Sequence, residues 1–141
     1  MTAAENKEVV RRFVDECVNR HRADLLEEFL GPRLTMHPGT PGSAPATEGV
    51  DQLRESFRRL RAALPDLRVT LEALIGEGDL VAARWTATGT HSGELAGVPG
   101  TGNPVRWGGV DVYRLADGRI TEWWRNDDFV HLLAQIGRPV L

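Results

Sequence analysis

The chain has 141 residues and a formal net charge of −3, with 17 Lys and Arg against 20 Asp and Glu. This length fits one domain, and such a chain can bury roughly two thirds of its unfolded surface without disulfides or metals. The slightly acidic balance, with no basic run interleaved with aromatic residues, argues against nucleic acid as a partner. We therefore expect a single domain over residues 1–141.

Cys17 is the only cysteine, which excludes an intrachain disulfide and a cysteine metal cluster. Its spacing from Phe13 and Val14 predicts a small core residue rather than a nucleophile. The N-terminal segment has no apolar signal core, and no stretch approaches the ~18 apolar residues that span a membrane. We expect a cytoplasmic protein that does not bind membranes.

The first half of the chain predicts three helices. Thr2 and Glu5 form a capping-box pattern, after which apolar residues recur every three or four positions up to Val18. A shorter helix is expected over Ala23–Leu30, ended by Gly31 and Pro32, and a third over Val50–Leu64, ended by Pro65.

A brief strand, Leu34–His37, and a long loop, His37–Gly49, lie between the second and third helices. Proline and glycine recur throughout this loop, so it predicts no regular element. Long irregular connections in compact domains are more often lids or binding loops than filler. The segment Ser92–Pro104 has the same composition and is a second candidate lid.

Alternating apolar and polar residues replace the helical period after Pro65 and predict strands over Leu67–Ile75, Leu80–His91 and two further segments up to Arg125. Helices followed by strands joined through short turns are the order of an α+β domain. We expect a curved antiparallel or mixed sheet wrapped by three N-terminal helices, a cone-shaped cavity, and a short closing helix over Phe129–Ile136.

The last hairpin carries most of the candidate site. A three-residue loop with Gly118 in the left-handed position would pair Tyr113 with Thr121, and Asp111 with Trp123. One face would then hold Trp107, Asp111, Tyr113, Thr121, Trp123 and Arg125, and the other Val110, Val112, Arg114, Ile120, Glu122 and Trp124.

Asp111 and Arg125 become neighbours in an aromatic wall if the first face lines the cavity. Burial would raise the pKa of the aspartate and the arginine would lower it, so that the carboxyl could act as base or acid. An ordinary cross-strand ion pair on an exposed or dimer-forming face is an equally good interpretation.

Four further residues are candidates. Asp127 and Asp128 precede the closing helix, and capping of its N-terminus is the better interpretation of Asp128. His37 and His91 border the two candidate lids and could carry protons at neutral pH. No HxH or HxxxH spacing supports a metal site.

The motifs GTHSGELAGVPGTGNPV, GVDVYRLADGRITEWW and LLAQIG, with NKEVVRRFVDE near the start, resemble the SnoaL-like polyketide cyclase and ester-cyclase family, of the nuclear-transport-factor-type cone fold. The likeness runs over nearly the whole chain. It implies a curved sheet wrapped by three helices, a homodimer or homotetramer built on the sheet, and a deep hydrophobic pocket. It also implies chemistry without metal or organic cofactor, typically an intramolecular aldol closure.

The chain departs from this family where the aldol-cyclising members hold their catalytic aspartate. That position follows the aromatic pair, which is Trp123-Trp124 here, and it is occupied by Arg125. Asp111 stands where some cyclases hold a companion histidine, while His91 keeps the GTH pattern.

The leading hypothesis is a cofactor-independent cyclase or isomerase that uses general acid/base catalysis on a hydrophobic, oxygenated, polyketide-like molecule. The catalytic residues would be Asp111, Arg125 and His91, and the substrate-binding residues His37, Trp85, Trp107, Tyr113, Trp123 and Asp128. One alternative is an epoxide hydrolase or epoxide-opening cyclase, as in limonene-epoxide-hydrolase-type relatives. Another is a non-catalytic binding or dimerisation module, because this fold hosts several functions.

Overall fold

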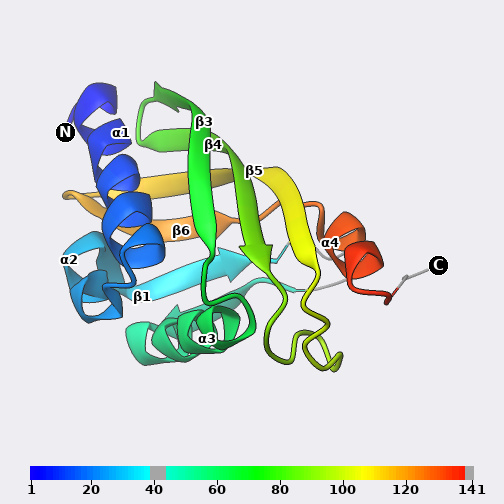
Figure 1. The fold of residues 1–141 in the computed structure, drawn as a ribbon. Helices are drawn as coiled ribbons and strands as arrows, with labels where there is room; N and C mark the ends of the chain where they lie inside the picture. Colours follow the sequence, from blue (N-terminus) through cyan, green and yellow to red (C-terminus); the bar gives the residue numbers. More distant parts are fainter. Residues whose placement is uncertain (39–43, 139–141) are drawn as a thin grey trace.

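The computed structural model describes residues 1–38 and 44–138. Within them, six strands form one sheet in the order β2-β1-β6-β5-β4-β3 (Figure 1). Their bounds are β1 Leu30–His37, β2 Ala46–Gly49, β3 Arg68–Glu77, β4 Leu80–Thr90, β5 Pro104–Ala116 and β6 Arg119–Trp124. Neighbouring strands are antiparallel except β1 and β6, which are parallel. The predicted α+β fold with a curved, mixed sheet is confirmed.

The helical segments are α1 Ala3–Arg12, η1 Phe13–Asn19, η2 Ala23–Leu25, α2 Leu26–Phe29, α3 Val50–Ala63 and α4 Phe129–Gln135. The helix α1 packs beside β3 and β4, and α4 packs beside β5 (Figure 1). None of the helices in the described part of the chain is both long and apolar enough to cross a membrane.

The predicted capping box at the start of α1 is confirmed. The Thr2 hydroxyl accepts a hydrogen bond from the Glu5 backbone N–H at 3.1 Å, and the Glu5 carboxylate accepts one from the Thr2 N–H at 3.2 Å. These two bonds satisfy helix-end donors that have no partner within the helix.

The first helix changes character at Phe13, where it continues as the π-helix η1. Its buried residues Phe13, Val14 and Cys17 face the sheet, so η1 supplies one wall of the interior. A π-helix is rare and is frequently found at functional sites.

Asn19, the last residue of η1, binds the edge strand β3 through its side chain. Its amide Nδ2 donates to the Val69 carbonyl at 2.8 Å, and its Oδ1 accepts from the Val69 N–H at 2.7 Å. Because both backbone groups of Val69 are satisfied by one side chain, Asn19 ties the π-helix wall to the sheet.

The substitution Asn19→Ala is expected to lower the free energy of unfolding by about 1–3 kcal/mol, because it leaves both Val69 groups without this partner. Urea unfolding followed by circular dichroism measures the effect. Asp15→Ala is the matched control on the same π-helix, since the Asp15 side chain forms an exposed ion pair with Arg20 at 3.4 Å. Equal effects of the two changes would contradict this role for Asn19.

The second predicted helix is shorter than expected, and the strand after it is longer. The α-helical part ends at Phe29, and Gly31 and Pro32 lie inside β1 instead of in a break between elements. Pairing with β2 on one side and β6 on the other extends the strand. The helix thus ends close to Gly31 and Pro32, as predicted, and strand pairing continues directly from its end.

The two candidate lids also differ from the expectation. Ala46–Gly49 of the first loop forms β2, and Gly39–Ser43 lie outside the described residues. The second loop is bound to the end of α3, where the N–H groups of Ser92 and Gly93 both donate to the Ala63 carbonyl. A Cβ at Gly93 would lie 2.4 Å from the Ala62 oxygen, so this loop packs tightly and does not line the cavity.

The last hairpin has a different register from the predicted one. Its loop is the two-residue turn Asp117-Gly118, with φ values of +51° and +79°, as Asp-Gly turns of type I′ require. Ala116 therefore pairs with Arg119, and a bulge at Thr121 brings Tyr113 opposite Trp123.

Because of this bulge, two residues of β6 do not lie on the faces that were predicted for them. Ile120 lies in the core with no exposed surface, although the regular alternation placed it on the outer face. Thr121, which was expected in the aromatic wall, does not line the cavity. A bulge adds one residue to one strand, so the alternation of faces changes at that point.

Candidate active site

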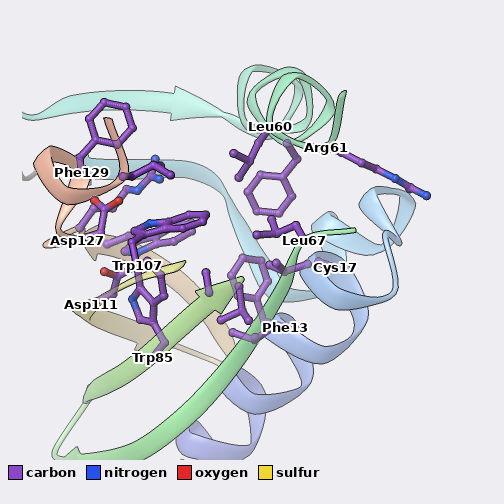
Figure 2. A pocket seen from close by; sticks show the side chains of 18 of the residues that line it. Phe13, Cys17, Leu60, Arg61, Leu67, Trp85, Trp107, Asp111, Asp127 and Phe129 are labelled. Carbon is purple, nitrogen blue, oxygen red and sulfur yellow. The ribbon is translucent and has the colours of Figure 1, made fainter. Parts of the chain in front are cut away.

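A cavity of about 1280 Å³ lies between the sheet, η1 and α3, and reaches α4. Figure 2 shows the Asp111 and Trp85 side chains at one end of it, with Phe13 and Cys17 on the helical side and Leu60 of α3 above. Most of the lining is apolar. A large apolar pocket with a few polar groups is the usual form of a small-molecule site.

The four aromatic residues predicted to form the wall all line this cavity, and they are Trp85, Trp107, Tyr113 and Trp123. Strands β4, β5 and β6 lie side by side, and the inward positions of each strand place these rings together. Trp85 meets Trp107 edge to face at a centroid distance of 6.1 Å. Tyr113 lies 5.1 Å from Trp123.

Asp111 is buried among these rings, with 5% of its surface exposed. Its Oδ2 accepts a hydrogen bond from the Trp123 Nε1–H at 2.9 Å, and its Oδ1 accepts one from the Asn126 backbone N–H at 3.2 Å. Burial raises the pKa of Asp111, while these two donors, Trp85 and the charge of Arg125 act to lower it. The carboxyl thus lies among the aromatic rings of a mostly apolar cavity.

The Asn126 N–H reaches Asp111 because the segment after β6 crosses closely over β5. Gly109 forms a bridge with Asp127. A Cβ at Gly109 would lie 2.5 Å from the Asn126 oxygen and 2.7 Å from the Asp127 Cα. Only glycine permits this approach.

Arg125 lines the cavity on the same wall, with its guanidinium 5.5 Å from the centre of the Trp123 ring. It acts on Asp111 through its charge. In the part of the chain that the structure describes, the two side chains form no ion pair within 4.0 Å. Asp111 and Arg125 therefore line one site, as predicted, but their carboxylate and guanidinium groups are not in direct contact.

Trp85 and Trp107 each carry an indole N–H that is buried and has no hydrogen-bond partner among the described residues. The Trp85 ring lies close enough to lower the pKa of Asp111, although its Nε1 does not reach normal hydrogen-bond geometry. Buried donors without a partner are rare, and each of these N–H groups could donate a hydrogen bond to an acceptor.

His91 does not join this site, so its predicted role beside Asp111 is not supported by the geometry. It is fully buried and absent from the cavity lining. Its Nδ1 accepts from the Thr101 backbone N–H at 3.3 Å and lies 2.9 Å from the Thr101 hydroxyl. These bonds tie His91 to Thr101 of the 92–104 loop.

His37 also points away from the cavity. It stacks on Trp124 at 4.8 Å, and its Nε2 lies 2.6 Å from the Glu122 carboxylate on the outer face of the sheet. The preceding Met36 faces the core, and the alternation of a strand sends the next side chain outward.

Asp128 caps α4, as predicted, by accepting from the His131 N–H at 3.1 Å. It lines the cavity together with Asp127. Cys17 is a buried core residue, also as predicted, and burial raises the pKa of its thiol to about 12.

His21 lines the cavity but had not been identified from the sequence. It follows η1 with a φ of +60°, in the left-handed region that residues other than glycine rarely adopt. Burial, followed by the charge of Arg61, lowers its pKa. A histidine in a connection between helices carries no sequence pattern that would reveal this position.

Residues 1–38 and 44–138 contain no group of three or more His, Cys, Asp and Glu side chains arranged to hold a metal ion. Asp111 and Arg125 are among the polar residues that line the cavity, together with Trp85 and Trp107, whose indole N–H groups are buried.

Known proteins share this fold and sequence pattern. The curated aklanonic acid methyl ester cyclase DnrD of Streptomyces peucetius is 28% identical over 134 residues, covering 94% of this chain and 90% of DnrD. The structure of IdmH from Streptomyces antibioticus, a proposed polyketide cyclase, has 34% identity and a TM-score of 0.79, covering 94% of this chain and 98% of IdmH. AclR from Streptomyces galilaeus, a proposed hydroxylase, has 27% identity and a TM-score of 0.86, covering 99% of this chain and 85% of AclR.

The family model for SnoaL-like polyketide cyclase matches residues 8–136, which is nearly the whole chain. This match agrees with the resemblance seen in the sequence motifs and with the mixed, curved sheet. The chain belongs to the SnoaL-like polyketide cyclase family.

Proposed function

We propose that this protein is a cofactor-independent cyclase that closes a ring in a hydrophobic, polyketide-like substrate by general acid/base catalysis at Asp111. The observation that carries the proposal is the buried Asp111 carboxyl in a cavity walled by four aromatic side chains. A carboxyl whose pKa is raised by burial is a stronger base once ionised, and it also holds a proton to return.

Ring closure by aldol addition needs one proton to leave carbon and one to reach oxygen. The Asp111 carboxylate takes a proton from a carbon next to a carbonyl, and the resulting enolate carbon attacks a second carbonyl of the same molecule. One carbon–carbon bond forms, and the new alkoxide takes the proton from Asp111 to give an alcohol. The carboxylate is restored, so no further reactant is consumed.

Arg125 serves as the oxyanion donor in this proposal. It lines the cavity on the same wall as Asp111 and has no ion pair with it, so its guanidinium N–H groups remain available to the enolate oxygen. Removing one donor of this kind typically costs about 10²–10³-fold in rate. Arg125 thus takes a new role at the position where aldol-cyclising relatives hold an aspartate.

The substrate class is supported by the relatives and by the cavity. DnrD is a cyclase of aklanonic acid methyl ester, and the matching family is one of polyketide cyclases. A volume of about 1280 Å³ with a mostly apolar lining fits a multi-ring, oxygenated molecule of that kind.

Incubation of the protein with aklanonic acid methyl ester, followed by liquid chromatography and mass spectrometry, tests the proposal. Aldol closure gives a new peak with unchanged mass, because no atom is gained or lost. Binding without turnover of this ester and of related polyketide esters would favour the non-catalytic binding module instead.

Epoxide opening is the second candidate function. It is favoured by the presence of Asp111, Asp127 and Arg125 among the residues that line the cavity. Asp127 would activate a water or an internal hydroxyl, while protonated Asp111 would donate to the epoxide oxygen. With water as the nucleophile the product is heavier than the substrate by one water, so the same mass measurement on an epoxide substrate separates the two chemistries.

A further inference from the structure

Trp123 contacts both polar residues of the proposed site through different parts of its indole ring. The Nε1–H at the ring edge donates to Asp111 Oδ2 at 2.9 Å. The ring face carries the Arg125 guanidinium at 5.5 Å from its centre. One side chain therefore sets where the carboxylate and the cation lie relative to each other.

The Trp123 ring is itself held from several sides, and only 6% of its surface is exposed. Its strand pairs with Tyr113 of β5 and with Met36 of β1. Phe13 of the π-helix meets the ring edge to face at 5.7 Å, and Tyr113 lies 5.1 Å away. Such packing leaves the N–H little freedom to turn away from Asp111.

The Asp111 carboxylate is bound at both oxygens, by Trp123 at Oδ2 and by the Asn126 N–H at Oδ1. Two donors on opposite oxygens prevent the carboxylate plane from rotating. Each oxygen retains lone pairs that can take a proton. A base fixed in this way meets its substrate in one orientation, which is how positioning contributes to rate.

We infer that Trp123 is a positioning residue of this site: its indole N–H fixes the Asp111 carboxylate in the orientation that receives the substrate proton, while its ring face holds Arg125 on the same wall. The consequence for turnover rests on the proposed function. The hydrogen bond between Trp123 and Asp111, and its effect on the titration of Asp111, do not depend on the proposed function.

The effect on titration follows from the groups around Asp111. Burial raises its pKa, and of the groups that lower it the Trp123 N–H acts most strongly, ahead of Trp85, Asn126 and Arg125. The neighbouring titratable group is Tyr113, whose own pKa burial raises well above the usual value, so it remains a neutral phenol. Loss of the Trp123 N–H must therefore move the titration of Asp111 to higher pH.

The test replaces the Trp123 side chain with benzothienylalanine, which keeps the shape and the ring face but has sulfur in place of N–H. A hydrogen bond to a charged acceptor contributes ~1.5–3 kcal/mol, so the proton affinity of Asp111 should rise about tenfold or more. The carboxyl ¹³C shift of labelled aspartate, assigned with Asp111→Asn, measures this titration without any substrate. An unchanged midpoint in the folded protein would overturn the inference.

Trp124 provides the matched control, because it follows Trp123 in the same strand but lies on the outer face, stacked on His37. Benzothienylalanine at position 124 should leave the midpoint unchanged. If neither analogue protein folds, the unmodified protein still gives the answer. Its Trp123 indole N–H resonance, assigned with Trp123→Phe, must titrate together with the Asp111 carboxyl carbon, and independent titration would contradict the hydrogen bond.

The proposed function and the role of Trp123 can fail separately. With turnover, the acid limb of the kcat/KM profile should move to higher pH in the analogue protein at position 123, which a merely structural side chain would not cause. Full turnover by Asp111→Asn would reject Asp111 as the base but would leave the measured hydrogen bond standing.

Discussion

Asp111→Asn is expected to lower kcat/KM by about 10²–10⁴-fold while the protein remains folded, because general acid/base catalysis contributes a factor of this size. The amide has nearly the same shape as the carboxyl but cannot take a proton from carbon at neutral pH. Initial rates of ring closure across a pH series, with circular dichroism of both proteins, measure the effect.

Asp127→Asn is the matched control for this loss. Asp127 lines the same cavity but is only half-buried and is not bound by Trp123. For the aldol reaction we expect a change of less than about tenfold, since Asp127 has no part in the proton transfer. If both variants lost activity equally, the two-carboxyl epoxide chemistry would gain support, and full activity of Asp111→Asn would reject the proposed base.

The difference in stability between the natural protein and Asp111→Asn should also depend on pH in a defined direction. Burial places the folded pKa of Asp111 above its unfolded value. The folded chain therefore binds more protons than the unfolded chain between about pH 4, the ordinary aspartate range, and that raised pKa. The natural protein therefore loses stability as pH rises through this window. Asparagine does not titrate, so the free energy of unfolding of Asp111→Asn should rise relative to that of the natural protein.

Gly109→Ala is expected to lower the free energy of unfolding by about 3 kcal/mol, the upper end of ordinary overpacking effects. The added Cβ would lie 2.5 Å from the Asn126 oxygen and 2.7 Å from the Asp127 Cα, and both are backbone atoms that cannot turn aside. For a chain of this size the change corresponds to a Tm lower by roughly 10 °C. Differential scanning calorimetry measures it.

Gly31→Ala is the control, because its Cβ would meet the Thr121 side chain at 3.5 Å, an ordinary contact. A much smaller change in Tm is expected there. Gly109→Ala should also disturb catalysis, since displacement of the 125–128 segment removes the Asn126 N–H from Asp111. Unchanged Tm in Gly109→Ala would show that this segment does not approach β5 as closely as described.

The sequence predicted the helices and strands wherever a regular period extended over several turns or pairs. The capping box at Thr2, the apolar period of the first helix and the alternation after Pro65 are local signals. They gave the α+β fold correctly, and the alternation along β5 placed Trp107, Asp111 and Tyr113 on one inner face. The family motifs gave the family, which the comparison confirms.

Register was the least predictable property, because it depends on which turn closes the hairpin. Asp117-Gly118 can close either a two-residue turn or a longer loop with a bulge, and the structure has the first. The bulge at Thr121 offsets this change in strand register. Trp123 therefore lines the cavity, as predicted, while Ile120 lies in the core. No residue near the turn reveals the bulge in the sequence.

By itself, the sequence determined which residues of β5 share one face, including Asp111 with Trp107 and Tyr113, since a strand alternates its faces with a period of two. The tertiary structure decided which side chains meet that carboxyl. It placed Trp123 and Asn126 on Asp111, brought in His21 from a helix connection, and turned His91 and His37 away. Contacts between distant segments depend on register, bulges and close backbone approach, and these are properties of the packed chain rather than of any local stretch.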